Sequence, residues 1–222
     1  NAAIAFAGQY YEIVIPNGEF FVNKPVTFKN HSKIRFEGGA IVANSTFVGE
    51  AVLYCDSLDS SNSQGYGSGY LLHPYIKALD DNVDAIGLCL EYIKNFDVTG
   101  LTTLGCIKGG FRQKRGYGLQ LTKFDITAPV VATATLSDKL VAGLRIDTTD
   151  AEVSMGAVEG YGIGVRTYAT NNFTHVHCWG LPNYGNAGDK LIMAYPFVST
   201  EKDNTFIGCY ADSPDLLDYN GV

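Results

Sequence analysis

The chain has 222 residues, of which 46% are hydrophobic and 18% are charged, so the composition is that of a globular protein and excludes a disordered one. The net charge of −7 argues against nucleic acid as a partner, because nucleic-acid-binding domains carry a basic patch or stripe. No apolar run approaches the ~18 residues of a membrane-spanning helix. We therefore expect no membrane insertion.

The N-terminal part predicts a series of very short strands. Residues 12–15 form an apolar run that ends at the turn sequence Pro16-Asn17-Gly18. Further strands are predicted at residues 20–22, 26–28 and 33–36, and only a few residues separate one from the next. Such short strands with tight corners favour one coil of a parallel β-helix, because hairpin proteins have longer alternating strands joined by two-residue turns.

Two polar, glycine-containing segments are predicted to be loop insertions, at residues 56–70 and 180–200. Residues 72–79 could hold a short helical turn, and a further coil of the solenoid is expected at residues 204–210. We expect residues 1–222 to form one domain. The start without Met and the end without a visible cap predict a fragment of a longer polypeptide.

One phrase recurs four times in the chain: a glycine and apolar residues, followed by a second strand. Each unit is about 20–30 residues long and too small to bury a hydrophobic face alone, so the units are expected to stack as a solenoid. The units run from Gly87 to Thr99, from Gly118 to Thr127, from Gly143 to Ser154 and from Gly164 to Thr174.

Asparagine precedes a hydrophobic strand three times, at Asn95, Asn172 and Asn204. Asparagine tolerates the left-handed conformation and can bond to nearby backbone. A stack of asparagines at one corner is therefore predicted.

The cysteines are odd in number, far apart in sequence and never arranged as CxxC. We expect them to be reduced, buried and small hydrophobic residues, which fits assembly in a reducing compartment. They are Cys55, Cys89, Cys106, Cys178 and Cys209.

Two segments resemble known parallel β-helix proteins. IVIPNGEFFVNKPVTFKNHSKIRFEGG (residues 13–39) resembles the opening turn of pectate-lyase-like proteins, and residues 143–180 resemble rungs of bacteriophage tailspikes. The resemblance implies an all-β, single-stranded right-handed parallel β-helix. It also implies a homotrimeric spike on the phage virion that binds, and often hydrolyses, a capsule or O-antigen polysaccharide at the bacterial surface.

Two alternatives stay open beside the hydrolase. One is a receptor-binding or structural β-helix of a tail or adhesin without catalysis, and the other is a polysaccharide lyase. Plant-wall lyases of this fold commonly bind calcium through aspartates, but no three aspartates occupy matched positions here. We therefore expect no metal and no other cofactor.

Asp97 and Asp125 are the first candidate catalytic pair, because FDVT and FDIT are the most similar repeats in the chain. If the phenylalanines point inward, both carboxylates point outward from one sheet. On adjacent strands ~4.8 Å apart, the two carboxyls would lie about 5 Å apart, as a retaining glycosidase requires. The alternative is two solvated strand residues.

A second acidic group follows, with Asp147 and Asp150 as catalytic candidates and Glu152 and Glu159 as substrate-binding candidates. These acids could supply a general acid and a water-activating base. The alternative is that residues 147–150 form a corner at which aspartate caps its own turn.

His177, Trp179 and Tyr210 are the remaining substrate-binding candidates. His175 and His177 could begin a metal site, but no third ligand is evident. Whether the histidines point inward depends on whether Phe173 or Val176 does, unless a bulge intervenes. Trp179 either packs under the following loop or offers its ring to a sugar.

A basic cluster lies in the sequence KGGFRQKR. It is interpreted either as a solvated loop or as a small patch for an anionic sugar. Its members are Lys108, Arg112, Lys114 and Arg115.

Overall fold

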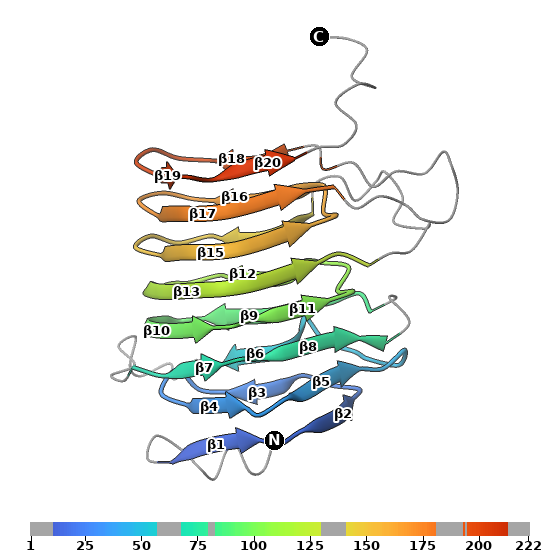
Figure 1. The fold of residues 1–222 in the computed structure, drawn as a ribbon. Coiled ribbons are helices and arrows are strands. Elements are labelled where there is room, and N and C mark those ends of the chain that lie inside the picture. Colours follow the sequence, from blue (N-terminus) through green and yellow to red (C-terminus); the bar gives the residue numbers. More distant parts are fainter. Residues whose placement is uncertain are drawn as a thin grey trace, which may run out of the picture.

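The computed structural model describes residues 11–56, 68–79, 83–129, 141–180, 193 and 195–212 (Figure 1). These residues form two β-sheets in which every strand pairs with its neighbours in parallel. Strands from successive passes of the chain lie one above another along a single axis. None of the described residues belongs to a helix long and apolar enough to cross a membrane.

The larger sheet has thirteen strands. They are β1 (Glu12–Ile15), β2 (Gly18–Val22), β4 (Lys33–Phe36), β5 (Gly39–Ala43), β7 (Tyr70–Leu72), β8 (Tyr75–Ala78), β10 (Ile93–Thr99), β11 (Thr102–Leu104), β13 (Gly116–Thr127), β15 (Glu152–Glu159), β17 (Asn172–Trp179), β19 (Thr205–Ile207) and β20 (Tyr210–Asp212).

The smaller sheet has seven strands and lies on the other side of the core. They are β3 (Val26–Phe28), β6 (Ala51–Asp56), β9 (Ile86–Glu91), β12 (Phe111–Gln113), β14 (Ala142–Ile146), β16 (Ile163–Thr167) and β18 (Tyr195–Ser199).

The larger sheet is curled because two stacks of short strands both pair with one long strand. Strands β1, β4, β7 and β10 form one arm and β2, β5, β8 and β11 form the other, and both arms pair with the twelve-residue strand β13. Strands β15 and β17 are also long and follow β13 in the next coils, where β15 pairs with β13 and β17 pairs with β15. Each of the three bends at one left-handed residue: Lys123 (φ 57°), Met155 (φ 56°) and His175 (φ 53°).

The predicted fold class, a single-stranded right-handed parallel β-helix, is therefore wrong. That prediction placed short strands on separate faces joined by corners. In the structure, β13, β15 and β17 run through the bend without a break, so two faces become one curled thirteen-stranded sheet opposite a second parallel sheet. The fold is all-β, with parallel strands in a curled sheet and a second parallel sheet.

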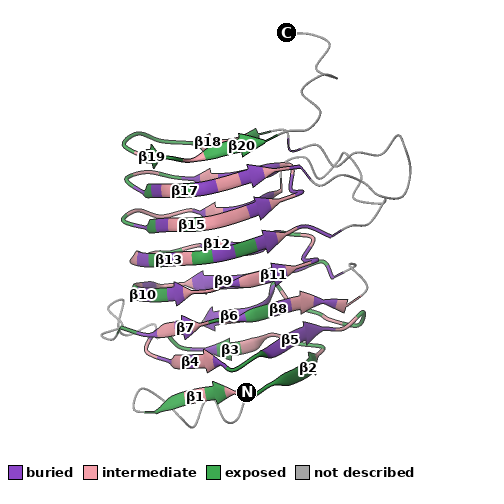
Figure 2. Ribbon diagram, viewed as in Figure 1, coloured by how far each residue is buried: buried purple, intermediate pink, exposed green. Residues whose placement is uncertain are grey.

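A single large apolar core lies between the two sheets (Figure 2). Its largest side chains are fully buried, and each contributes about 1.5–3 kcal/mol by leaving water. Exposed residues concentrate at the two ends of the stack, on β2 at one end and on β19 and β20 at the other. The phenylalanines among these fully buried side chains are Phe28, Phe96, Phe111 and Phe173.

The pairing register corrects the predicted repeat. Phe111 pairs with Leu88 and Leu144, and Leu144 pairs with Val165, all in the smaller sheet. The glycines that precede these four residues are Gly87, Gly110, Gly143 and Gly164. Gly118 instead lies in β13 of the larger sheet, with φ 70°. The second repeat was therefore aligned on the wrong glycine.

The strands predicted at residues 12–15, 26–28 and 33–36 are confirmed as β1, β3 and β4. Within residues 72–79, β7 ends at Leu72, β8 occupies Tyr75–Ala78, and a single residue in 3₁₀ conformation, Leu79, follows β8. Most of the two predicted loop insertions, 56–70 and 180–200, lies outside the described residues.

All five cysteines are free, as expected, and all but Cys209 are buried. Burial raises the pKa of the Cys106 thiol to about 12. Such a thiol stays protonated and unreactive at neutral pH, so its role is packing.

Asparagines do stack at one corner, but of the three predicted only Asn204 takes part, and its partner is Asn171; Asn95 and Asn172 belong to β10 and β17. Asn171 is fully buried. Its Oδ1 accepts a bond from the Ala151 amide at 2.8 Å, and its Nδ2 donates to the Thr148 carbonyl at 2.7 Å. The Asn204 Oδ1 accepts from the Asn171 amide at 3.1 Å. The side chains thus join consecutive coils.

Replacing Asn171 with Ala should lower the free energy of unfolding by about 2–3 kcal/mol, because buried backbone groups lose their partners. The measurement is the denaturant midpoint with m-values compared. The matched control is Asn172→Ala, an exposed neighbour whose side chain, among the described residues, bonds to Glu152 alone. Equal losses for the two variants would contradict this account of the corner.

Candidate functional site

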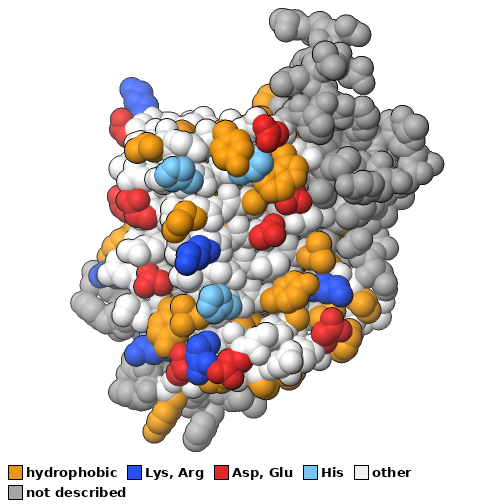
Figure 3. Space-filling model, viewed as in Figure 1, with side chains coloured by type: hydrophobic (Ala, Val, Ile, Leu, Met, Phe, Trp, Pro, Cys, Tyr) orange, Lys and Arg blue, Asp and Glu red, His pale blue; other side chains and the backbone are white. Residues whose placement is uncertain are grey.

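Acidic and aromatic side chains gather on the outer face of the curled sheet, where β13, β15, β17 and β20 lie side by side. Figure 3 shows this face, with acidic, histidine and hydrophobic side chains close together near one end of the stack. The strand register forms two rows, Asp125–Ala157–His177–Tyr210 and Thr127–Glu159–Trp179–Asp212.

His177 is the centre of an aromatic group. Its ring stacks on that of Tyr210, with centroids 3.9 Å apart and planes 22° apart, and it lies 4.2 Å from the Trp179 ring. Its Nε2 lies 3.0 Å from Oδ2 of Asp212. The contact with Asp212 fixes the imidazole, so the three rings form a held platform.

The orientation of the histidines is settled by the bend in β17. Phe173 and Val176 are both fully buried, although they are three residues apart in a strand. The left-handed residue His175 between them resets the alternation, so His177 faces outward. The sequence alone left both orientations open.

Glu159 is the most perturbed acid of this face. Burial first, and then the negative charge of Asp125, raise its pKa to about 7. Thr127 and Trp179 occupy the register positions on either side of it. A carboxyl with this pKa is still largely protonated just below neutral pH, and can therefore donate a proton.

Asp125 is exposed and lies one strand away from Glu159 and two residues back along β13. A strand spacing of ~4.8 Å and a rise of ~3.3 Å per residue place the two Cα atoms about 8 Å apart. Both side chains leave the same face of the sheet, so the Asp125 carboxylate is a neighbour of the Glu159 carboxyl and its charge contributes to the raised pKa.

Five of the residues predicted from the sequence therefore come together. Strand pairing, rather than sequence proximity, unites them, since they come from four strands. They are Asp125, Glu159, His177, Trp179 and Tyr210.

The predicted catalytic pair of Asp97 and Asp125, about 5 Å apart, is wrong. Asp97 pairs with Gln120, whereas Asp125 pairs with Thr102 on one side and Ala157 on the other. Asp125 comes five residues after Gln120 in β13, which is about 16 Å along a strand. The misplaced second repeat produced the false alignment of FDVT with FDIT.

Glu152 lies in the same row as Asp97, with Gln120 between them. Its Oε1 accepts a bond from Nδ2 of Asn172 at 2.7 Å. Glu152 thus lies at one end of β15 and Glu159 at the other, so the two acids are at opposite ends of this sheet face. The structure does not place it with the aromatic platform.

Asp147 and Asp150 also lie away from this face, at the corner after β14. Asp147 accepts bonds from Nε of Arg145 at 2.6 Å and Nε of Arg112 at 2.9 Å. Asp150 has φ 60° and accepts a bond from the Thr149 hydroxyl at 2.9 Å. Residues 147–150 do form a corner, but the Asp147 carboxylate binds two arginines instead of capping its own turn.

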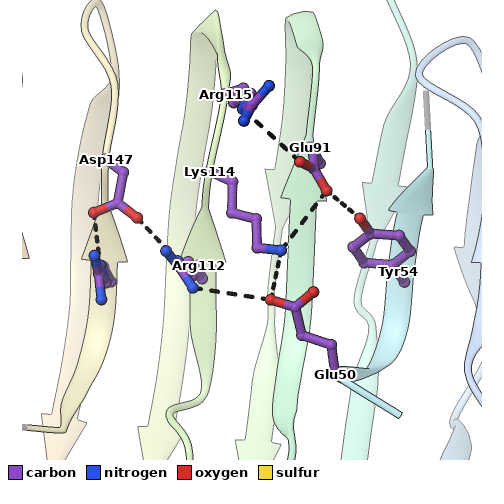
Figure 4. Close-up of polar contacts among 8 residues, drawn as sticks. Glu50, Tyr54, Glu91, Arg112, Lys114, Arg115 and Asp147 are labelled. Carbon is purple, nitrogen blue, oxygen red and sulfur yellow. Dashed lines mark hydrogen bonds and ion pairs between the residues drawn. The ribbon is translucent and has the colours of Figure 1, made fainter. Parts of the chain in front are cut away.

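Three members of the basic cluster, Arg112, Lys114 and Arg115, belong to a network of ion pairs on the outer face of the smaller sheet (Figure 4), whereas Lys108 pairs with Asp84. Lys114 Nζ lies 2.5 Å from Glu50 and 3.7 Å from Glu91. Glu91 also accepts a bond from the Tyr54 hydroxyl and lies 4.0 Å from Arg115. Because Arg112 lies on β12, the interpretation as a solvated loop is wrong for this residue.

Sequence reasoning missed Asp212 and Thr127. Thr127 ends the FDIT repeat, so a correct alignment would have placed it beside Glu159. Asp212 comes two residues after Tyr210, and its position beside Trp179 depends on the register of β20 against β17. The intervening insertion hides that register in the sequence.

The described residues contain no group of three or more His, Cys, Asp or Glu side chains arranged to hold a metal ion. His175 is exposed at its bend, and His177 contacts Asp212. The chemistry available at this face is thus a proton donor, a carboxylate and a platform of rings.

No protein-family model and no curated protein sequence matches the chain. Among solved structures, the fold is similar to that of a protein from Parabacteroides merdae described as a "putative glycosyl hydrolase", with a TM-score of 0.50 and 13% sequence identity. The similarity covers 96% of this chain and 86% of that one. At this identity the likeness concerns the fold alone.

Replacing Asp125 with Asn should lower the pKa of Glu159, because the neighbouring negative charge that raises it is removed. Burial remains, so the pKa should stay above its ordinary value. The measurement is a pH titration of the ¹³C-labelled Glu side-chain carboxyls by NMR. Asp97→Asn, which removes the same charge from the far end of the sheet face, is the control; an equal shift in this variant would contradict the assignment.

Proposed function

We propose that the chain is a carbohydrate-active protein that binds a saccharide on the outer face of the curled sheet and hydrolyses it there. The observation that carries the proposal is the raised pKa of Glu159 beside the Trp179–His177–Tyr210 platform. The description of the Parabacteroides merdae protein agrees with this class of activity.

In the proposed reaction, Glu159 is the general acid. Its carboxyl proton passes to the glycosidic oxygen as the bond from that oxygen to the anomeric carbon breaks. Asp125 accepts a proton from a water molecule whose oxygen attacks the anomeric carbon from the opposite side. The products are two saccharides, one with an inverted anomeric centre.

The platform has a binding role. Trp179 is half-buried and Tyr210 is 53% exposed, so both rings can contact the apolar face of a sugar. His177 lies between them and is held by Asp212 at 3.0 Å. A fixed platform loses little conformational freedom on binding, which favours affinity.

The finer proposal is that the saccharide is a bacterial capsule or O-antigen and that the chain belongs to a homotrimeric phage tailspike. The likeness of residues 13–39 and 143–180 to such proteins supports it. Sedimentation of the purified protein at micromolar concentration should give a trimer. Clearing zones on lawns of encapsulated bacteria would identify the polymer, and a monomer without clearing would contradict this part.

Replacing Glu159 with Gln should reduce hydrolysis at least 10²-fold, because the variant lacks the transferable proton. Reducing ends released from isolated polysaccharides give the rate, and NMR of the first product gives the anomeric configuration, expected to be inverted. Binding should persist. The matched control is Glu152→Gln at the other end of β15; unchanged hydrolysis in Glu159→Gln would overturn the catalytic proposal, and binding without hydrolysis in the wild type would favour a receptor-binding protein.

Replacing Trp179 with Ala should weaken saccharide binding by about tenfold or more, because the largest ring of the platform is lost. Calorimetric titration with oligosaccharide fragments measures the change, and thermal unfolding checks that the variant folds. The control is Tyr168→Ala, which removes an exposed ring just beyond β16, outside the platform, and should leave the affinity unchanged. Equal affinity of wild type and Trp179→Ala would place the saccharide elsewhere.

A further inference from the structure

Three arginines lie in register on the smaller sheet. Arg112 on β12 pairs with Arg145 on β14, and Arg145 pairs with Arg166 on β16. Adjacent strands are ~4.8 Å apart, so the three side chains leave the same sheet face at that spacing. Like charges this close repel each other, so the arrangement needs anions nearby.

The described residues supply anions for only part of this row. Asp147 accepts from the Nε atoms of Arg112 and Arg145, and the terminal nitrogens of Arg145 bind no other described residue. Arg112 Nη1 also lies 3.9 Å from Glu50. Within the described part of the chain, Arg166 has no ion-pair partner and is half-buried. The row therefore has unmatched positive charge at the Arg166 end, in a chain with net charge −7.

The same three arginines line a hollow of about 400 Å³. Its walls also include the apolar side chains of Ile86, Phe111 and Val141. This volume is at the lower end of the range typical of small-molecule sites, and it is larger than a simple inorganic anion needs. The apolar walls lower the local polarity and strengthen charge-assisted bonds at the arginines.

We propose that this hollow binds an acidic sugar, with its carboxylate or sulfate on Arg145 and Arg166. A guanidinium presents paired N–H donors that match either oxyanion, and the apolar walls suit the carbon face of a pyranose ring. The inference that the ligand is an anion depends only on the arginines of this sheet face. The inference that it is a saccharide rests on the proposed function. The site is distinct from the acidic and aromatic face of the curled sheet.

The test is calorimetric titration at low salt with four probes. They are a uronic-acid trisaccharide, its neutral methyl ester, a sulfated disaccharide and sodium sulfate. The acidic saccharides should bind at least tenfold more tightly than the ester and than sodium sulfate, and the ratio between carboxylated and sulfated probes identifies the preferred group. Equal affinity for acid and ester, or for sodium sulfate and the saccharides, would overturn the proposal.

The variant that tests the residues is Arg166→Gln, expected to weaken binding of the acidic saccharide about tenfold or more. Since Arg166 has no ion-pair partner among the described residues, the change leaves none of their carboxylates unpaired. Arg166→Lys keeps the charge without the fork and should be intermediate. The matched control is Arg115→Gln, an arginine on the same network whose side chain is 63% exposed and outside the hollow; it should stay within about twofold of wild type.

The outcomes separate this inference from the proposed function. If a neutral saccharide binds the Trp179 platform, acidic saccharides bind no more tightly, and Arg166→Gln has no effect, the inference is contradicted and the proposed function is not. Acidic saccharides bound through Arg166, together with full hydrolysis by Glu159→Gln, would sink the catalytic proposal and leave the inference standing.

Discussion

The left-handed bend in the long strands is the constraint on which the outer face of the curled sheet depends. One residue per pass takes this conformation, at some cost in backbone strain where it is not glycine. The bend lets buried residues on both sides of it face one core, and so it also decides which residues face outward. The aligned positions are His73, Gly100, Lys123, Met155, His175 and Gly208.

Parallel in-register strands bring equivalent side chains within ~5 Å of each other, and the two sheets use this closeness differently. On the curled sheet, Asp125 and Glu159 are offset by two residues, and the half-buried member responds by a raised pKa. On the smaller sheet, Arg112 and Arg145 share Asp147 as a common partner. Repulsion between the two carboxylates is relieved by protonation of Glu159, whereas repulsion between the two arginines is relieved by their shared ion pair with Asp147.

Much of the local structure could be predicted from the sequence, because strands such as residues 12–15 and 33–36 are bounded by turn residues that act locally. The parallel stacking also followed from repeat length. Register could not be predicted, because Gly118 resembles Gly87 and Gly143 in its sequence context yet lies on the other sheet. Aligning the repeats on Gly118 therefore placed Asp97 beside Asp125, whereas the structure holds them apart. The continuity of β13 through Lys123 was equally invisible, because a left-handed lysine leaves no signature.

The position of the Asn171 corner ties stability to the proposed site. Asn171 immediately precedes β17, the strand that carries His177 and Trp179, and its side chain bonds to the coil that contains β15. A slip of β17 by one residue would exchange its inward and outward side chains, turning Cys178 outward and Trp179 toward the core. Because Asn171 holds the start of β17 to the Ala151 amide, the corner opposes that slip and keeps the platform beside Glu159.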